Sequence, residues 1–420
     1  MPMPTKKHSA KKGALEDQDN EPITTNSNWV DKLNQAIDDL GTNRTSTREE
    51  ALTNIINGLT MHNASEVLEN RNRELLILLR KSLQKGNSTK ESILAAKAMP
   101  LAFINHGEIS LGEEEDHYQL VANSLRSTLV NSFECDLKIQ CLHSIALIAF
   151  IGASDIDTQL LRDFIFDIIE TGGEEVQLEG ISSQQIEHLT CAALRAYGLL
   201  YISTFCEGAV DFDVLWEEVE KVVPVHEMLL ESSEKDVRVA AGENIALMFE
   251  SVRVYTEHIE EEEDVDDTEW PEYDNMDGLI HTLRDLSVDS NRRRSKNDRA
   301  EQKSVFRDVI KSVEEGTRPV EELKISGRIL TFRGWSKILL LNAFRRAIGQ
   351  GLQQHIKTND MLRQVFHYSC RFGTGSAADS DDDDPGELSN VDKRYVYDKR
   401  EKLRTKQIRS ARNGKELLEI

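Results

Sequence analysis

The fold is decided most clearly by the stretch DVRVAAGENIALMFE at residues 236–250. Its apolar residues recur at intervals of three and four, which is the spacing that places side chains on one face of an α-helix. The small residues at 240–242 let a second helix approach closely, and such packing offsets the roughly 1 kcal/mol that Gly242 costs relative to alanine in a helix. We therefore interpret this face as a packing surface rather than a functional pocket. It consists of Val237, Ala240, Ala241, Ile245, Met248 and Phe249.

Similar segments occupy most of the chain before this stretch. They fall near residues 66–84, 89–105, 116–132, 135–151, 156–170, 184–206, 212–230 and 235–255, so two helices recur roughly every 40 residues, as in helical-repeat proteins. Such a helix pair cannot bury its apolar faces alone, and stacking on neighbouring pairs completes the core. Only 8 prolines occur in 420 residues. The sequence therefore predicts an all-α fold, an armadillo/HEAT-like helical-repeat solenoid over residues 29–258.

An earlier motif indicates where one of these helices begins. The sequence Ser46-Thr47-Arg48-Glu49 has the Ser-x-x-Glu form of a capping box, in which each side chain satisfies a free backbone N–H at the helix start. The residues after it, including Leu52 and Ile56, form one apolar face. The motif predicts a helix whose N-cap is Ser46.

Segments without this periodicity divide the rest of the chain. We expect a disordered arm over residues 1–28 and a charged linker over 259–300, where eight of the ten residues from 260 to 269 are acidic. A C-terminal helical region follows over 301–372, with a short hairpin or extended connector at 323–335. An acidic disordered linker over 373–390 separates this region from a basic helix over 391–420.

Charge is distributed unevenly along the chain. The net charge is −23, but residues 1–290 carry 23 Lys and Arg against 55 Asp and Glu, and residues 291–420 carry 28 against 19. The two parts therefore have net charges of −32 and +9. A polyanion such as RNA is attracted to the second part and repelled by the first.

The last 30 residues carry the most informative chemistry. Residues 391–415 hold ten Lys and Arg against Asp392, Asp398 and Glu401, and their helix formers favour a helix that is polar on almost every side. One interpretation is a solvated tail that folds back on the acidic solenoid. The other, which we favour, is an RNA-binding helix whose two tyrosines stack on unpaired bases. The candidate RNA-binding residues are Lys393, Arg394, Tyr395, Tyr397, Lys399, Arg400, Lys402, Arg404, Lys406, Arg409, Arg412 and Lys415, with a secondary basic patch at Arg292, Arg293, Arg294, Lys296 and Arg299.

Motifs for catalysis and cofactor binding are missing from the sequence. It contains no GxxxxGK phosphate loop, no HExxH, no GxSxG and no kinase signature. The aspartates at 379–384 depart from a calcium loop because Gly386 comes two places too late. We expect reduced, mostly buried thiols, since no CxxC pair occurs. These thiols belong to Cys135, Cys141, Cys191, Cys206 and Cys370.

These features exclude several classes of function. We expect no enzyme activity, cofactor, metal or small-molecule substrate. No apolar run approaches the roughly 18 residues of a membrane span, and the first residues lack the apolar core of a signal peptide. We therefore expect no membrane association and a cytoplasmic, and alternatively nuclear, location.

The C-terminal helical region resembles a known family. The run Gln302-Lys303-Ser304-Val305-Phe306-Arg307-Asp308-Val309 is similar to the conserved block of the interferon-related developmental regulators. The runs at 47–52 and 240–247 resemble the solenoid helices of that family, so the likeness extends over about residues 40–370. The block residues are Phe306, Arg307, Trp335, Gly349, Gly351, His355, Asn359, Arg363 and Phe366.

The resemblance implies a binding protein of armadillo-like fold without enzyme activity. Members of the family are described as ribosome-bound factors that silence or preserve idle ribosomes, with C-terminal helices in RNA-lined channels. They are also described as nuclear co-regulators that contact deacetylase-type co-repressor complexes. The basic C-terminal end favours the first role, with the ribosome and its RNA as partner. The second remains the alternative, with protein partners along the solenoid groove.

Overall fold

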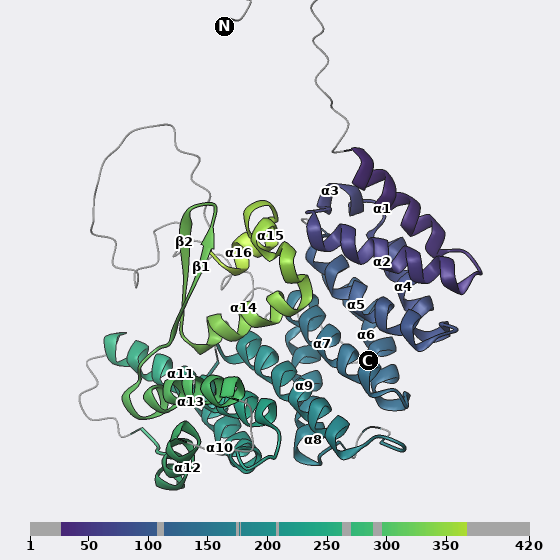
Figure 1. Ribbon diagram of the computed structural model, residues 1–420. Helices are drawn as coiled ribbons and strands as arrows, with labels where there is room; N and C mark the ends of the chain where they lie inside the picture. The colour runs from purple at the N-terminus through teal and green to yellow at the C-terminus, as the bar shows by residue number, and fades with distance from the viewer. Residues whose placement is uncertain are drawn as a thin grey trace, which may run out of the picture.

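The computed structural model describes residues 27–106, 113–173, 176, 178–206, 210–262, 270–288 and 296–367. Within these residues the chain forms an arc of helices, and a later segment lies inside the arc (Figure 1). The helices of the arc are α1 Ser27–Leu40, α2 Thr45–Met61, α3 Ser65–Leu68, α4 Asn72–Lys85, α5 Thr89–Ile104, α6 Glu113–Asn131, α7 Cys135–Gly152, α8 Asp155–Glu170, α9 Ser183–Tyr201, α10 Phe212–Leu229, α11 Lys235–Glu262, α12 Met276–Val288 and α13 Lys296–Glu315.

These helices pack as antiparallel pairs that stack on one another. The pairs are α1 with α2, α4 with α5, α6 with α7, α8 with α9, α10 with α11, and α12 with α13. The second helices of the pairs, α2, α5, α7, α9, α11 and α13, contact each other in that order and form one continuous layer. We call this the inner layer. The expected all-α helical-repeat solenoid is confirmed, and in the structure the stacking continues through α13.

The middle of the inner layer is unusually apolar. Helix α7 packs against α5, α6 and α9, and segment 183–206, which contains α9, packs against α7, α8 and α11. Both segments are long and apolar enough to cross a membrane by length and composition, so the expectation that no apolar run approaches this length is wrong. In the structure 67% of the first and 78% of the second apolar window is buried, as is typical of the core helices of a helical array. Their composition therefore follows from their central position.

The stretch that decides the fold lies in α11 and faces its neighbours as expected. All six of its predicted packing residues are buried. Gly242 lies beneath the ring of Phe306 from α13, and a Cβ atom at this position would come within 2.8 Å of the Phe306 Cε1 atom. The close approach predicted for the small residues at 240–242 is thus confirmed.

The predicted start of α2 is wrong. The helix begins at Thr45, its N-cap residue is Arg44, and no side chain caps it. Glu49 instead accepts a hydrogen bond of 2.6 Å from Ser88 Oγ, at the start of α5 in the next pair. The glutamate is used between repeats rather than within its own helix, which a local motif cannot reveal.

A hairpin follows the last helix of the arc. Strands β1 Val320–Ile325 and β2 Arg328–Arg333 pair antiparallel, with Val320 opposite Arg333 and Ile325 opposite Arg328. Of the two alternatives for residues 323–335, the hairpin is therefore the one that forms. Its return strand directs the chain back toward the inner layer.

The chain then crosses the inner layer in the reverse direction. This segment consists of α14 Trp335–Ile348, the 3-10 turn η2 Gly349–Gly351, α15 Leu352–Thr358 and α16 Asp360–Val365. Helix α14 contacts α11, α9, α7 and α5, and α15 contacts α2 (Figure 1). We call residues 335–366 the strap, because they connect the last helix pairs to the first.

Hydrogen bonds fasten the strap at its far end. The His355 Nε2 atom lies 3.0 Å from Leu59 O and 3.1 Å from Thr60 O, two carbonyls near the end of α2, so this nitrogen must carry the proton. The Asn359 amide donates to Ile104 O, the last carbonyl of α5, at 2.7 Å. Both side chains are buried and satisfy carbonyl groups that a helix end leaves without partners.

The near end of the strap is fixed to α11 and α13. The backbone N–H of Trp335 donates to Glu250 Oε2 at 2.9 Å, so a carboxylate lies at the N-terminus of α14, where the helix dipole favours negative charge. The indole N–H of Trp335 donates to Ser312 Oγ at 2.8 Å. The strap is thus bonded to both ends of the inner layer.

The structure places one helix inside the range expected to be a charged linker and a second helix across the end of that range. Helix α12 lies within the range 259–300 that was assigned to a linker, and it packs on α13. Helix α13 begins before residue 301 and packs on α11 as the last member of the inner layer. The predicted arm at 1–28, the acidic linker at 373–390 and the basic helix at 391–420 lie outside the described residues, except for residues 27 and 28 at the start of α1.

The seat of the strap on α2 provides a test of this arrangement. A Cβ atom on Gly351 would lie 1.7 Å from the Thr60 carbonyl oxygen, so Gly351→Ala must push the strap off α2. We expect a loss of about 2 kcal/mol or more in unfolding free energy, as for other overpacked sites, together with faster amide exchange at residues 352–366.

Gly58→Ala is the matched control for that variant. Its Cβ atom would make an ordinary contact of 3.5 Å with Leu33 Cδ1, and alanine is the better helix former. Urea unfolding and hydrogen exchange measure both variants. Equal stability of the two variants would contradict the seating of the strap on α2.

Candidate functional site

The candidate RNA-binding residues of the C-terminal end lie outside the described part of the chain. This applies to all twelve residues from Lys393 to Lys415, and to Arg292, Arg293 and Arg294 of the secondary basic patch. Lys296 and Arg299 lie in the first turns of α13, but their side chains are also outside the described residues. These assignments stay predictions.

Most residues of the family block make packing or hydrogen-bonding contacts within the fold. Phe306 covers Gly242, and Trp335, His355 and Asn359 fasten the strap through the hydrogen bonds given above. Phe366 packs edge-on against Phe332 of the hairpin and Phe344 of α14. Gly349 and Gly351 lie between α14 and α15, Arg363 forms an ion pair of 2.7 Å with Asp360, and Arg307 is exposed on α13. Most of the block therefore holds the strap on the inner layer.

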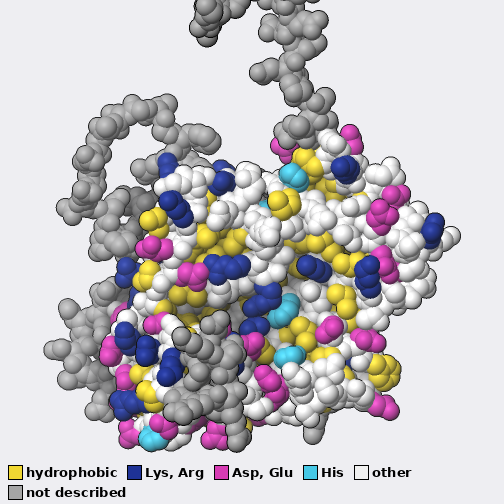
Figure 2. All heavy atoms as spheres, viewed as in Figure 1, with side chains coloured by type: hydrophobic (Ala, Val, Ile, Leu, Met, Phe, Trp, Pro, Cys, Tyr) yellow, Lys and Arg dark blue, Asp and Glu magenta, His cyan; other side chains and the backbone are white. Residues whose placement is uncertain are grey.

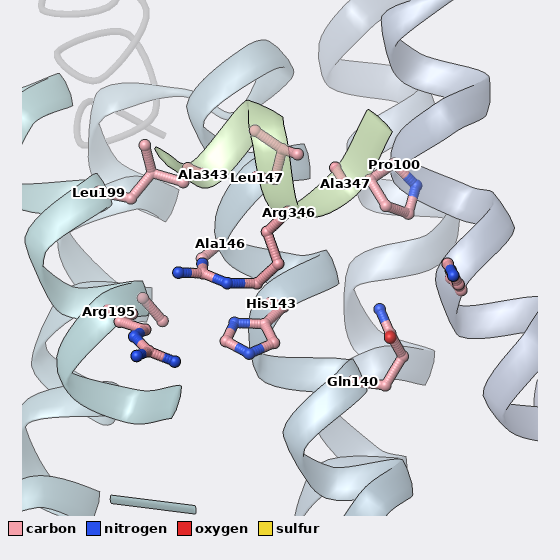
Figure 3. Close-up of a pocket in the computed structure, with 12 residues that line it drawn as sticks. Pro100, Gln140, His143, Ala146, Leu147, Arg195, Leu199, Ala343, Arg346 and Ala347 are labelled. Atoms are coloured by element: carbon pink, nitrogen blue, oxygen red, sulfur yellow. The ribbon is translucent and has the colours of Figure 1, made fainter. Parts of the chain in front are cut away.

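The strap and the inner layer enclose a pocket that no sequence motif marked. Figure 3 shows side chains from four helices around it. We call it the strap pocket. Its lining residues are Lys97 and Pro100 of α5, Gln140, His143, Ala146 and Leu147 of α7, Arg195, Ala196 and Leu199 of α9, and Ala343, Arg346 and Ala347 of α14.

The polar lining of the strap pocket is mainly basic. The guanidinium groups of Arg195 and Arg346 and the ring of His143 lie near one another around the same space (Figure 3). Neither guanidinium forms a hydrogen bond or ion pair with any residue in the described part of the chain. Arg195 is partly exposed and Arg346 is exposed, so both guanidinium groups can be reached by an anion from solution.

The pKa values of these groups respond to that environment. Burial, and then repulsion from Arg195, lower the pKa of Arg346 to about 10. Burial, and then the positive charges of Arg346 and Arg195, lower the pKa of His143 to about 3. The imidazole is therefore neutral at physiological pH, while the Arg346 guanidinium group remains charged.

One carboxyl group lies close enough to be affected by the two arginines. Burial raises the pKa of Glu243 on α11 to about 7, against the opposing attraction of Arg195 and Arg346. The carboxylates of Glu301 and Asp236 raise this pKa further. Glu243 is consequently only partly ionised near neutral pH, and it forms no direct ion pair with either arginine among the described residues.

The surface around the strap pocket is also rich in basic side chains. Figure 2 shows Lys and Arg side chains gathered over the middle of this face, where α14 crosses the inner layer, with apolar side chains between them. Asp and Glu side chains lie mainly toward its margin. The centre of the face is thus a basic area within a body whose net charge over residues 1–290 is −32.

The chemistry available in the pocket is that of anion binding. Paired guanidinium groups match the oxygens of a carboxylate or phosphate in bidentate geometry. Burial raises the pKa of the neighbouring Cys191 thiol, so it is not an activated nucleophile. The described residues contain no group of three or more His, Cys, Asp or Glu side chains suited to holding a metal ion.

The sequence pattern could have given only a weak indication of this pocket. Lys97, His143 and Arg195 are each about one repeat apart and occupy the same face of consecutive inner helices. Arg346 is far from them along the chain and joins them only because the strap folds back. A search for polar residues at equivalent positions of successive repeats would have found the first three.

Comparison with known proteins gives the following matches. The model of the family "Interferon-related developmental regulator (IFRD)" matches residues 3–314. Interferon-related developmental regulator 2 of Mus musculus is 29% identical over 345 residues, which cover 81% of this chain and 73% of the mouse protein. Interferon-related developmental regulator 1 of Homo sapiens is 29% identical over 345 residues, which cover 80% and 70%. An uncharacterized protein of Schizosaccharomyces pombe is 27% identical over 384 residues, which cover 88% and 81%.

The raised pKa of Glu243 predicts a pH dependence of stability. A carboxyl group whose pKa rises to about 7 on folding binds its proton more tightly in the folded state, so stability falls as pH rises through this range. Because Gln cannot ionise, the stability of Glu243→Gln does not fall with pH for this reason. Relative to wild type, we expect the variant to gain about 2 kcal/mol in unfolding free energy between pH 5 and pH 8.

Urea unfolding at the two pH values measures this gain. Glu50→Gln, at an exposed position of α2, serves as the control for removal of one carboxylate. A difference between Glu243→Gln and wild type that stays constant with pH would show that Glu243 keeps an ordinary pKa.

Proposed function

The chain belongs to the interferon-related developmental regulator family, and on that premise we propose that it is a ribosome-associated regulator of translation. In this proposal the basic C-terminal segment, residues 391–420, binds ribosomal RNA. The helical solenoid carries that segment and presents surfaces for protein partners. The protein would act by occupying a site on the ribosome rather than by catalysing a reaction, and it would be cytoplasmic.

The charge distribution is the observation that carries this proposal. Residues 291–420 have a net charge of +9 and residues 1–290 a net charge of −32. Lys and Arg side chains gain affinity for RNA by releasing the counterions condensed on its phosphates. The acidic body loses by the same effect, so RNA contact is directed to the C-terminal end.

The tyrosines of the segment add a second kind of contact. Tyr395 and Tyr397 lie among ten Lys and Arg residues between 391 and 415. Aromatic rings stack on unpaired bases without regard to base identity, and each such contact contributes about 1–3 kcal/mol. This combination suits the single-stranded and looped regions of ribosomal RNA better than a regular duplex.

The strap gives the basic segment a defined point of departure. Its far end is bonded to α2 and α5 through His355 and Asn359. The next helix, α16, leads back, and Phe366 packs against Phe332 of the hairpin and Phe344 of α14, so residue 367 is held beside the hairpin. The chain beyond that residue starts from a rigid position on the acidic body.

The alternative is a nuclear co-regulator scaffold that binds deacetylase-type co-repressor complexes. The basic strap pocket supports it, because this pocket offers a site for an acidic protein partner on the solenoid itself. In that case the basic C-terminal segment is dispensable for complex formation.

Sucrose-gradient sedimentation of the tagged full-length chain separates these possibilities. We expect co-sedimentation with ribosomes that is lost when residues 391–420 are deleted. We also expect the affinity to fall on the order of a thousandfold between 50 and 200 mM salt, as for proteins with about six to ten phosphate contacts. Replacement of Tyr395 and Tyr397 by Leu should weaken binding without changing the salt dependence.

Deletion of residues 1–26 is the control for loss of a terminal segment. That segment also contains lysines, Lys6, Lys7, Lys11 and Lys12, and its removal should leave sedimentation unchanged. Ribosome binding that survives deletion of 391–420 would overturn the role given to the basic segment. Ribosome-free nuclear complexes that survive the same deletion would favour the co-regulator function.

A further inference from the structure

The strap pocket presents two guanidinium groups that the rest of the described chain leaves without hydrogen bonds or ion pairs. Arg195 comes from α9 and Arg346 from α14, and Lys97 of α5 lies at the same pocket. We propose that the strap pocket is a binding site for a carboxylate side chain of an acidic partner peptide that lies along the inner layer. This proposal does not depend on ribosome binding by the C-terminal segment.

The unpaired positive charges at the strap pocket favour binding of an anion. Both guanidinium groups line the same pocket, and the charge of Arg195 is close enough to contribute to the lowered pKa of Arg346. A carboxylate between them would accept hydrogen bonds from both guanidinium groups in the planar geometry that arginine favours. It would also relieve the repulsion, so binding is favoured beyond the direct contacts.

The lining favours a peptide over a nucleic acid. Pro100, Leu147 and Leu199 contribute apolar surface beside the cations, which suits the aliphatic neighbours of a Glu or Asp residue. No Phe, Tyr or Trp side chain lines the pocket, so the large rings on which bases usually stack are missing there. The surrounding acidic body repels a strand with a phosphate on every nucleotide more strongly than a peptide with few charges.

The inner layer offers a continuous path for such a peptide. Lys97, Gln140, His143 and Arg195 lie on the same face of three consecutive helices, so they form a row that crosses the repeats. Gln140 and the neutral His143 supply hydrogen-bonding groups for a peptide backbone. Stacked repeats commonly present an extended surface of this kind.

The strap pocket is complete only when the strap lies across the inner layer. Arg346 is part of α14 and reaches the pocket only when the strap lies across the inner layer. Glu243 of α11 is the nearby internal carboxyl group and competes with an external anion for the same two arginines. Removal of that carboxylate should therefore strengthen binding of an acidic peptide.

Fluorescence anisotropy with the full-length protein tests the proposal. The probe is a fluorescein-labelled dodecapeptide of alternating Glu and Leu residues, and its control has Gln in place of every Glu. We expect the Glu peptide alone to bind, with about a tenfold rise in Kd for Arg195→Gln and for Arg346→Gln. Arg345→Gln is the matched control, because it removes the same charge from the next position of α14, where Arg345 pairs with Glu321 outside the pocket.

Glu243→Gln provides a variant with the opposite expectation. It should lower the Kd of the Glu peptide severalfold, and this gain cannot arise from a loss of folding. Thermal unfolding of every variant shows whether the arginine changes disturb the fold. If they do, the response of Glu243→Gln decides the proposal.

Several outcomes would overturn the proposal. They are equal binding of the Glu and Gln peptides, equal losses in Arg345→Gln and Arg346→Gln, and no gain in Glu243→Gln. A further such outcome is binding of a U12 oligonucleotide that Arg346→Gln weakens more than it weakens the peptide, since this would assign the pocket to RNA. Peptide binding that appears only after replacement of residues 381–384 by Asn would assign the pocket to the acidic segment of the chain itself.

Discussion

The structure depends on one constraint: a pair of helices cannot bury the apolar faces of both members without a neighbour. Stacking of the pairs solves this for the outer helices and for the sides of the inner ones, but it leaves one face of the inner layer open. The strap covers the middle of that face, where α14 packs on α5, α7, α9 and α11. Apolar surface removed from water contributes about 25 cal/mol per Å², so this cover stabilises the whole array.

The sequence was sufficient for the repeat fold because the relevant signals are local. Apolar periodicity within one helix, and small residues such as Gly242 at a contact, state which face packs and how closely. The strap could not be predicted in the same way. Its attachments join His355 to Leu59 and Asn359 to Ile104, residues that are far apart in the sequence and related only by folding. The prediction that Glu49 caps its own helix was wrong for the same reason, since the partner of Glu49 lies on the next repeat.

Of the two candidate sites, one could be found from the sequence and the other could not. Composition alone identified the basic C-terminal segment, because charge needs no fold to be counted. The strap pocket needed the fold, because Lys97, His143, Arg195 and Arg346 come from four helices and share no motif. Several residues of the block, His355 and Asn359 among them, hold the strap in place through hydrogen bonds. These block residues thus attach the strap, and none of the block residues lines the strap pocket.

The curvature of an open solenoid can vary, because it is the sum of many small rotations between neighbouring repeats and the two ends are free. Here the strap acts as a chord across the arc, bonded near one end at Glu250 and near the other at Leu59 and Ile104 (Figure 1). The length of the chord, rather than the summed rotations, then sets the curvature. The strap also bonds to helices near both ends, so fraying at either end must break contacts with the strap as well as contacts with the next repeat. The strap thereby couples repeats that would contact only their neighbours in a linear array.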